Sequence, residues 1–475
     1  MPKQQDITED VLYAPVRELG DLVRARRISP VALTEAYLAR LDKLGPKLGA
    51  VVTITRDLAL KEAKAADREI RAGRYRGPLH GIPYGAKDLL ATKGIPTTWG
   101  AAPYKDQVFD HDATVVRQLR SAGAVLVAKL AMVELAGGFG YNHADASFTG
   151  PGRNPWDTAY WSGGSSSGPG AAVAAALVAF AIGSETSGSI ITPAAYCGVS
   201  GMRPTYGRVS RHGAMALCWT LDKLGPMCRT ADDCGLVLAA LAGADPLDPT
   251  KVAKPFRYPL RSEGKKFKIG VIKGTSERAQ PEVRTNFKAA VDVLRRFADV
   301  EEGVEFPALP FGQAVGTIID AEAASAFREL LESGRVRELR AADDRWGGYA
   351  GLAVLAVDYL QAMRARGPMK RALDALYAKY DALVAPSRST VSSPIDLAFD
   401  KAYPGVGGGP SVIAAGNIAG QPAISVPDGF GLKKLPTGVQ FTGRAWSEAR
   451  LLAIADAYQR ATDWHKKRPP IKAGS

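Results

Sequence analysis

Two loops rich in glycine and serine hold the residues of this chain whose types and spacing could do chemistry. SGGSSSG spans 162–168, GSETSGS spans 183–189, and an uninterrupted run of small apolar residues separates them. Gly/Ser-rich segments often serve as flexible linkers, but these loops flank residues that must be buried. Buried glycines indicate tight turns or backbone N–H groups that closely approach a neighbour. The pattern is typical of a serine nucleophile with an oxyanion hole, or of a close-packed strand–helix junction.

A lysine lies in an apolar, glycine-rich segment, GPLHGIPYGAKDLL, at 77–90. Ile82 and Tyr84 predict a buried strand there, and Lys87 follows them. Lysine is almost never fully buried without a partner. Lys87 is therefore either a strand-end lysine that reaches solvent or a desolvated lysine whose lowered pKa lets it act as a base.

A Ser–His–Asp triad fits poorly, although residues 164–168 match G-x-S-x-G. The nucleophile elbow needs a strand directly before it, and the segment RNPWDTAYW at 153–161 does not have a strand pattern. Only His212 and His465 follow the loop, and neither has a supporting local motif. A serine nucleophile would therefore need another base. Because Ser–Lys pairs are a known variant, Lys87 is the best candidate.

The elements that must position these residues alternate between strands and helices, which predicts an α/β protein built from βαβ units. The strands on either side of a helical middle can share one sheet. Expected strands lie around 82–84, 124–129, 266–272, 382–386, 423–427 and 439–442, with a further strand ending near 183. Expected helices lie at 16–26, 31–44, 56–72, 114–122, 170–178, 230–241, 281–297 and 446–462, and helices dominate 313–380.

One long loop, 132–156, connects two of these elements and is rich in glycine and aromatic residues, including Phe139 and Tyr141. A loop of this length in a compact protein is usually functional or disordered. Its apolar content argues against disorder. The loop is therefore a candidate wall of a pocket.

Composition predicts a soluble, cytoplasmic enzyme that binds neither nucleic acid nor membrane. The 475 residues carry a net charge of +13, but the lysines and arginines are scattered and no RNA-binding motif occurs. The four cysteines form no C-x-x-C pair, and no pattern of metal ligands is present. The polar start MPKQQDITED has no apolar core of a signal peptide, and the longest apolar run, 171–182, is too short to span a bilayer.

Several ordered motifs resemble those of the amidase signature family. They are GIPYGAKDLL, SGGSSSGPGAAVAAAL, GSETSGSIITPAAYCGVSGMRPTYGRVSR, LDKLGPMCRTADD, DALVAPS and GQPAISVPDGF, and the similarity extends from about residue 15 to about residue 465. The resemblance implies one amidase domain over 1–475, with a large twisted mixed β-sheet and helices on both faces. Within it we expect an N-terminal helical segment (1–75), the signature catalytic core (76–245), and the rest of the sheet (246–475), whose helical middle (313–380) covers the pocket.

The resemblance also implies a Ser–cis-Ser–Lys triad. The nucleophile falls on Ser189, the cis-serine on Ser165 and the base on Lys87. Oxyanion donors would be the backbone N–H groups of the loop that ends at the nucleophile, namely Thr186, Ser187, Gly188 and Ser189. A neutral lysine can take a proton from Ser189 through Ser165, and no metal or organic cofactor is implied.

Departures from the family pattern bear on the substrate. Family members often carry an arginine two or three residues after the nucleophile, where this chain has Ile191 and Thr192. Glu185 replaces the usual Asp, and Ser187 replaces the usual Gly. Without an arginine at position 191 or 192, a carboxylate-bearing substrate would lose its bidentate partner. The predicted pocket residues are Met132, Phe139, Gly140, Tyr141, Ile191 and Thr192.

These features favour a hydrolase of neutral, fairly apolar amides, aryl amides (anilides) or carbamates, with esters as further substrates. The protein would act on a small molecule as a monomer or homodimer. The alternative is the glutamine-hydrolysing A subunit of a tRNA-dependent amidotransferase complex. The basic charge favours that alternative mildly, and the missing arginine counts against it because glutamine carries a carboxylate.

Overall fold

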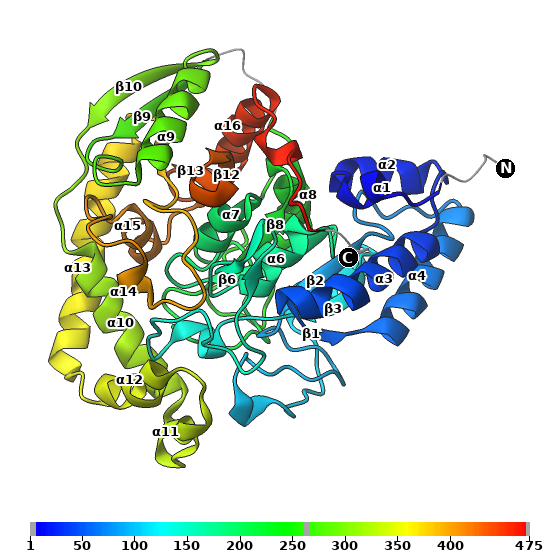
Figure 1. The fold of residues 1–475 in the computed structure, drawn as a ribbon, viewed down its shortest axis with the longest axis horizontal. Coiled ribbons are helices and arrows are strands. Elements are labelled where there is room, and N and C mark those ends of the chain that lie inside the picture. Colours follow the sequence, from blue (N-terminus) through cyan, green and yellow to red (C-terminus); the bar gives the residue numbers. More distant parts are fainter. Residues whose placement is uncertain (1–5, 261–265, 472–475) are drawn as a thin grey trace.

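A mixed β-sheet with helices on both faces forms the centre of the molecule (Figure 1). The computed structural model describes residues 6–260 and 266–471, so the two ends of the predicted domain and the segment 261–265 lie outside the description. Within the described residues, eleven strands are ordered β1-β3-β2-β6-β8-β7-β12-β13-β11-β9-β10. Their bounds are β1 (Val51–Ile54), β2 (Pro83–Lys87), β3 (Val125–Leu130), β6 (Phe180–Glu185), β7 (Ser200–Arg203), β8 (Lys223–Cys228), β9 (Phe267–Ile272), β10 (Ala298–Val304), β11 (Ala382–Pro386), β12 (Ala423–Phe430) and β13 (Pro436–Thr442).

Parallel pairing is confined to two regions of this sheet. β2 lies between β3 and β6 and is parallel to both, and β9 lies parallel between β11 and β10. The other neighbouring pairs are antiparallel. Parallel strands need crossover connections, and helices supply them between β2, β3 and β6. The predicted α/β class and mixed sheet are confirmed.

The sheet is covered on both sides because alternate side chains of its strands enter different hydrophobic cores. In β3, Leu126 belongs to one core and Val127 to another. In β6, Ile182 and Ala181 separate in the same way. A strand buried on both faces reads as a continuous apolar run rather than an alternating one. This explains the part of the small-apolar stretch between the two serine loops that forms β6; the part before it includes the buried helix α6.

Local signals set several helix boundaries. Ser29 caps the helix that begins at Pro30, and its hydroxyl accepts hydrogen bonds from the N–H groups of Val31 and Ala32 at 3.1 and 3.4 Å. Thr230 caps the helix that begins at Ala231. The α-helices are α1 (Glu9–Tyr13), α2 (Val16–Arg24), α3 (Pro30–Leu48), α4 (Arg56–Arg71), α5 (Thr114–Ser121), α6 (Ser167–Ala174), α7 (Ile191–Cys197), α8 (Ala231–Leu241), α9 (Pro281–Leu294), α10 (Phe311–Ala326), α11 (Arg328–Glu332), α12 (Ala342–Leu352), α13 (Ala356–Tyr377), α14 (Phe399–Ala402), α15 (Val412–Ile418) and α16 (Glu448–Arg460).

The structure contains strands that the sequence analysis did not predict. β8 contains Gly225 and Pro226, residue types that are unfavourable inside a strand, yet both pair with β6. β10 carries three exposed acidic side chains, Asp299, Glu301 and Glu302, as suits a strand at the edge of a sheet. The segment 153–161, before the first serine loop, has no strand pattern in its sequence. Its residues Asp157–Trp161 form β5, which pairs with β4 (Arg153–Asn154) in a separate two-stranded sheet.

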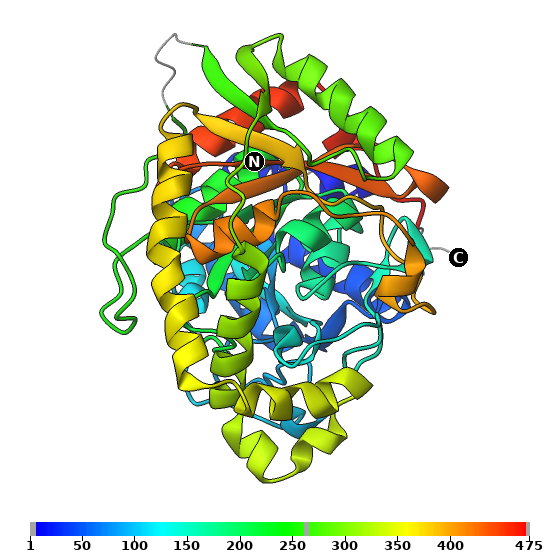
Figure 2. The same cartoon turned by 90° about the vertical axis from the view of Figure 1, so that its left-hand side faces the viewer.

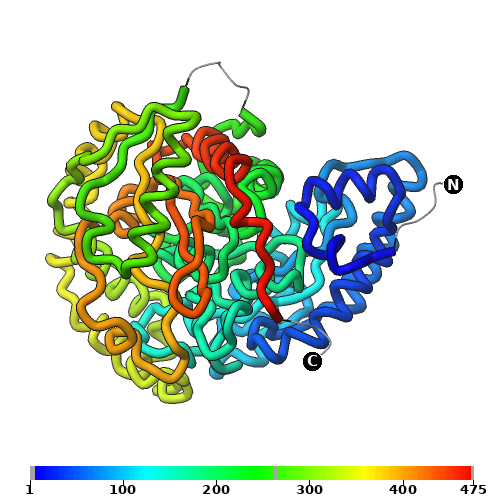
Figure 3. The backbone as a smooth tube through the Cα atoms, turned by 45° about the horizontal axis from the view of Figure 1, so that its top comes forward, coloured from blue at the N-terminus to red at the C-terminus, as the bar shows by residue number. Residues whose placement is uncertain are grey.

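The helical middle and the chain ends lie at the periphery. α10 and α13 run side by side, and α11 and α12 lie at one end of this pair (Figure 2). The chain after α16 returns toward the N-terminal helices (Figure 3), where Arg468 lies 2.6 Å from the Asp10 carboxylate and 4.7 Å from the Tyr13 ring centroid. No helix of the described residues combines the length and apolarity needed to cross a bilayer.

Candidate active site

Lys87 is the last residue of β2, and its side chain is fully buried. Its Nζ lies 2.8 Å from Ser165 Oγ, 2.9 Å from Ser184 Oγ and 3.1 Å from Ser166 Oγ. Burial lowers the pKa of Lys87 to about 7, and the carboxylates of Asp222 and Glu185 oppose this shift only in part. Lys87 is therefore not a strand-end lysine that reaches solvent. Lys87 is partly neutral near pH 7 and can accept a proton there.

The first serine loop brings Ser165 to the lysine. The Gly164–Ser165 peptide bond is cis, and Gly163 has a φ of +86°. A Cβ at Gly163 would lie 2.7 Å from Pro193 Cα, so only glycine fits where this loop passes α7. The loop also touches the second one directly, since the Ser166 N–H donates to the Ser189 carbonyl oxygen at 3.2 Å.

The second serine loop connects the end of β6 at Glu185 to the start of α7 at Ile191. Gly188 has a φ of +89°, a conformation that glycine adopts without strain. Among the hydrogen bonds of the described residues, none has the N–H of Ser187, Gly188 or Ser189 as its donor. These backbone groups are therefore available to a bound oxygen atom, as an oxyanion hole requires.

Ser189 faces a cavity, and its hydroxyl makes no hydrogen bond to any described residue. The structure thus contains the Lys87–Ser165 contact but no hydrogen bond from Ser165 to Ser189. Catalytic hydrogen bonds often tighten only when substrate binds. The backbone hydrogen bond between Ser166 and Ser189 keeps the two loops adjacent in the structure.

Glu185, which stands where the family usually has Asp, holds the second loop in place. Its Oε2 accepts hydrogen bonds from the N–H groups of Ile190 and Ile191 at 2.9 and 3.0 Å. Its Oε1 pairs with Arg203 Nη1 and with Asn417 Nδ2, each at 2.8 Å. Burial opposes ionisation of this carboxyl, but Arg203, Asn417 and the backbone donors outweigh it and lower its pKa to about 2. Glu185 is therefore a buried anion that positions the loop.

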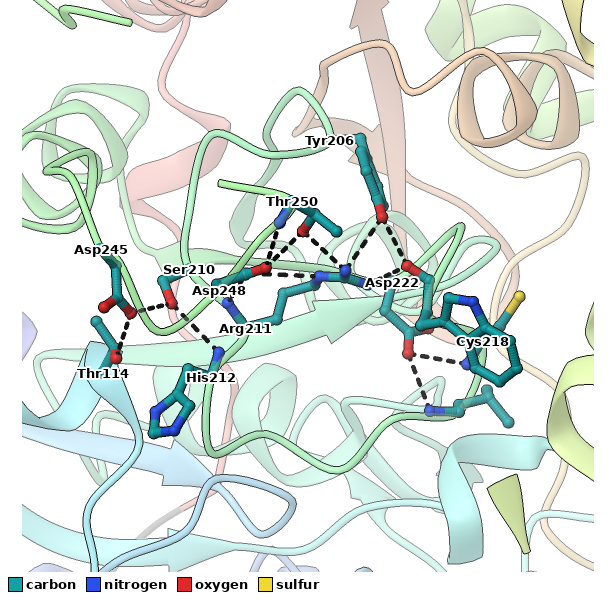
Figure 4. Close-up of polar contacts among 12 residues, drawn as sticks. Thr114, Tyr206, Ser210, Arg211, His212, Cys218, Asp222, Asp245, Asp248 and Thr250 are labelled. Carbon is teal, nitrogen blue, oxygen red and sulfur yellow. Dashed lines mark hydrogen bonds and ion pairs between the residues drawn. The ribbon is translucent and has the colours of Figure 1, made fainter. Parts of the chain in front are cut away.

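Asp222 supports the same loop from the other side. One oxygen accepts the Thr186 hydroxyl at 2.7 Å, and the other accepts the N–H groups of Leu217 and Cys218 at 2.9 Å each. Figure 4 shows these backbone contacts beside a polar network in which Arg211 reaches Tyr206 and Thr250 at 3.0 and 2.8 Å. Sequence reasoning quoted Asp222 within the motif LDKLGPMCRTADD but missed this role, because its partner Thr186 lies 36 residues away in sequence.

The cavity that Ser189 faces has a volume of about 760 Å³. Of the expected oxyanion-hole residues, Thr186, Ser187 and Ser189 form part of its wall, whereas Gly188 does not contribute to it. The remaining wall combines aromatic side chains with hydroxyl groups. Its members include Tyr141, Trp161, Thr192, Tyr196, Ile319, Ser387, Arg388, Ser389, Thr390, Ser393, Phe399, Tyr403, Ser411 and Ile413.

The predicted pocket residues divide into two groups. Tyr141 and Thr192 line the cavity, but Met132, Phe139, Gly140 and Ile191 do not. Met132 and Ile191 are fully buried, and Phe139 packs edge-on against Phe327 with ring centroids 5.7 Å apart. Gly140 is exposed to solvent. Packing in the core, which the sequence does not display, therefore keeps Met132, Phe139 and Ile191 away from the cavity, whereas Gly140 lies on the surface.

Another part of the wall comes from residues that sequence reasoning did not select. Of the helical stretch 313–380, only Ile319 lines the cavity, whereas the chain from 385 to 414 contributes many residues to it. This later segment follows β11 and leads into α15. It includes Arg388, the only charged side chain of the lining among the described residues. A search for an arginine near the nucleophile in sequence could not find it.

Within the described residues, no cluster of three or more His, Cys, Asp or Glu side chains could hold a metal ion. The four cysteines are buried, unpaired thiols. The groups at the site that can react are thus the hydroxyls, the backbone amides and the Lys87 amine. This set suits acyl transfer through a serine nucleophile.

Comparison with known proteins places this site in a class. The family model described as Amidase matches residues 32–452. The chain belongs to the amidase signature family, whose members act as hydrolases on amide C–N bonds.

Individual relatives cover nearly the whole chain. The A subunit of the glutamyl-tRNA(Gln) amidotransferase from Moorella thermoacetica is 37% identical, over 97% of this chain and 99% of its own length. The corresponding protein of Methylococcus capsulatus is 35% identical, over 95% and 98%. Among solved structures, peptide amidase from Stenotrophomonas maltophilia superimposes with a TM-score of 0.85 at 32% identity, over 97% of this chain and 99% of that one.

Proposed function

We propose that this chain hydrolyses a linear amide bond of a small molecule through an acyl-enzyme formed on Ser189. One observation supports this proposal above all. A buried lysine with a pKa of about 7 contacts Ser165, and a second serine with unpaired backbone donors faces the adjoining cavity. A neutral amine is a competent general base near neutral pH, which an exposed lysine is not.

The proposed chemistry runs in two halves. Ser189 Oγ attacks the amide carbonyl carbon, and its proton passes through the Ser165 hydroxyl to Lys87 Nζ. The carbonyl oxygen becomes an oxyanion near the N–H groups of the second loop. When the C–N bond breaks, the proton returns along the same route to the leaving amine. Water then attacks the ester of Ser189 with the same relay as base, and the acid product leaves.

The acyl chemistry would serve anilides, carbamates and esters as well as aliphatic amides. The name of the structural neighbour peptide amidase fits this reading loosely. The expectation of a neutral, fairly apolar substrate has weaker support, because the cavity carries many hydroxyls and one guanidinium.

A second candidate is glutamine hydrolysis as the A subunit of an amidotransferase. The similar curated relatives carry that name at 35–37% identity over nearly their full length, so the comparisons favour this candidate over a stand-alone amidase. Against it stands the described cavity wall, which contains no Asp or Glu to receive the ammonium group of glutamine.

Kinetic assays on the purified chain test the first proposal. The substrates are a p-nitroanilide, an aliphatic amide, an aryl carbamate and a matched ester, each with wild type and with Ser189→Ala. We expect wild type to turn over at least the anilide, and Ser189→Ala to lose at least about 10³-fold in kcat while its thermal midpoint stays unchanged. A folded Ser189→Ala variant with near-normal activity would show that another residue is the nucleophile.

Two measurements separate the second candidate. One is glutaminase activity of the chain alone, and the other is the same activity after affinity purification from its native cells at low salt. Release of ammonia from glutamine that requires co-purifying subunits would favour the amidotransferase role. Robust anilide hydrolysis by the isolated chain with no glutaminase activity would favour the first.

A further inference from the structure

Arg388 lies at the same cavity as Ser189, and hydrogen bonds of the neighbouring residues fix the backbone that carries it. It follows β11 by two residues. The neighbouring Ser387 is buried; its N–H donates to the Gly438 carbonyl at 2.7 Å, and its hydroxyl lies 2.7 Å from Ser425 Oγ. The preceding Pro386 carbonyl accepts from Gln440 Nε2 at 3.1 Å. The backbone that carries Arg388 is therefore tied to β12 and β13.

The Arg388 side chain is open to the cavity, although protein surrounds it. The residue is exposed, and it belongs to the cavity wall. The titratable side chains that face its guanidinium are the phenols of Tyr196 and Tyr141. Both phenols also line the cavity, and Tyr196 Oη lies 3.1 Å from Thr390 Oγ1. The cation is thus set among neutral hydroxyl groups.

Other arginines of the interior show what a structural role looks like here. Arg203 pairs with Glu185 at 2.8 Å, and Arg208 pairs with Glu448 at 3.0 Å. Arg229 donates to the backbone carbonyl oxygens of Tyr13 and Ala14, at 3.0 and 2.8 Å. Among the described residues, Arg388 has neither a carboxylate partner nor a hydrogen bond to a backbone carbonyl, and no Asp or Glu lines its cavity.

We propose that Arg388 binds a carboxylate of the substrate in the cavity that Ser189 faces. This inference rests on the proposed function and names its substrate class, a linear amide that carries a carboxylate and no neighbouring ammonium group. A guanidinium offers two parallel N–H groups to a carboxylate, and in a partly desolvated cavity such a pair is strong. Because no Asp or Glu lines the described cavity, the ammonium group of a zwitterion would find no carboxylate partner there. The proposed substrate class therefore excludes free glutamine.

The assignment also revises the expectation of a neutral substrate. That expectation used the absence of arginine at Ile191 and Thr192, directly after the nucleophile. Here an arginine that follows β11, in the other half of the sheet, reaches the same cavity. A carboxylate can be held from that wall without any help from α7.

Matched pairs of substrates test this inference. In the first pair, glutaryl p-nitroanilide carries a carboxylate on its acyl group and pentanoyl p-nitroanilide does not. In the second pair, 4-acetamidobenzoate carries a carboxylate on its amine part and acetanilide does not. In at least one pair we expect wild type to prefer the carboxylate substrate about 10- to 100-fold in kcat/KM, the range of a charge-assisted hydrogen bond. Arg388→Met should remove that preference, so that its kcat/KM values for the two members of the pair differ by less than about threefold.

Two controls make the result specific. Arg364 is exposed on α13 and lies outside the cavity wall, so Arg364→Met changes the net charge equally and should keep the preference. Glutarate should inhibit hydrolysis of the neutral anilide in wild type, and at least tenfold more weakly in Arg388→Met, which reports binding without turnover of the anionic substrate.

The outcomes distinguish this inference from the proposed function. If wild type hydrolyses the neutral and anionic members of both pairs equally, or if Arg388→Met keeps the preference and the glutarate inhibition, the carboxylate site is wrong and the amidase proposal stands. If wild type hydrolyses no member of either pair, the amidase proposal fails on these substrates, and unaltered thermal midpoints of wild type and Arg388→Met with glutarate would then refute the anion site as well.

Discussion

At the scale of single residues, the environment of Lys87 decides what the site can do. A lysine in water is protonated at neutral pH and cannot accept a proton. The buried amine of Lys87 has a pKa of about 7, because burial outweighs the carboxylates of Asp222 and Glu185. The three serine hydroxyls around it offer hydrogen bonds to the neutral amine without a charge that would hold the proton.

The pH dependence of the reaction should report this amine. The unprotonated form is the base, so kcat/KM for a neutral anilide should rise about tenfold per pH unit below about pH 7 and level off above it. Lys87→Met should lower kcat/KM by at least about 10²-fold. The measurement is a pH–rate profile with a substrate that does not titrate. A flat profile from pH 5 to about 9 would rule out a titrating lysine base.

At the scale of elements, the site depends on how closely two loops and a helix pack. The first serine loop passes α7 at Gly163, and the second is anchored between β6 and α7 by Glu185. Arg203 of β7 and Asn417 of α15 complete the anchor. Small changes at these junctions should therefore affect catalysis without touching a reacting atom.

Gly163→Ala tests the first junction. The added Cβ would lie 2.7 Å from Pro193 Cα at a φ of +86°, so the loop must shift relative to α7. We expect a fall in kcat of at least tenfold and a loss of about 2 kcal/mol or more in the free energy of unfolding. Gly73→Ala is the matched control, because Gly73 has a φ of +82° with no atom within 4 Å of the new Cβ. Equal effects at the two positions would mean that backbone strain alone, and not the junction, is responsible.

Glu185→Gln tests the second junction. The change leaves Arg203 buried without its counter-charge, which should cost about 3–5 kcal/mol in the free energy of unfolding. The pKa of Glu185 is lowered to about 2, so its stabilising effect is fully present above about pH 4.5 and is lost as pH falls toward 2. Urea unfolding of wild type and variant at pH 7 and pH 3 would show the difference shrinking with acid.

A suitable control for this comparison is Glu332→Gln, which breaks an exposed pair with Arg328. That change should alter the free energy of unfolding by less than about 1 kcal/mol. A loss at Glu185 no larger than at Glu332 would contradict the anchoring role.

At the scale of the whole molecule, the N-terminal helices are tied to the catalytic core. Arg229, directly after β8, donates to the carbonyl oxygens of Tyr13 and Ala14 and to those of Val173 and Val178, at 2.8 to 3.3 Å. Arg40 of α3 donates to the Ala175 carbonyl at 2.8 Å. Arg229 thus joins the N-terminal segment to the C-terminal end of α6 and to the chain that follows it.

Arg229→Ala should weaken the whole fold, because it leaves several buried carbonyl groups without a donor. We expect a loss of about 3 kcal/mol or more in the free energy of unfolding, with the N-terminal helices and the core still unfolding in one transition. Calorimetry and urea unfolding of the variant, with exposed Arg257→Ala as control, provide the measurement. An early, separate transition of the N-terminal region would show that it is an independent unit.

The sequence by itself determined the fold class and the residues that could react. The alternation of strands and helices predicted the α/β class, and the loop motifs with their family resemblance pointed to Lys87, Ser165 and Ser189. These signals are local, or they are motifs read along one stretch of chain. They required no knowledge of which strand lies beside which.

Only the tertiary structure decided the strand order, the pKa of Lys87 and the composition of the cavity. The fold brings Asp222 to Thr186, Glu185 to Asn417, and Arg388 to the cavity of Ser189, although these residues are remote from one another in sequence. Burial and electrostatic partners arise when remote segments pack, and no periodicity records them. For the same reason Met132 and Ile191, which looked like pocket residues, lie in the core, and an arginine from the end of β11 faces the cavity instead.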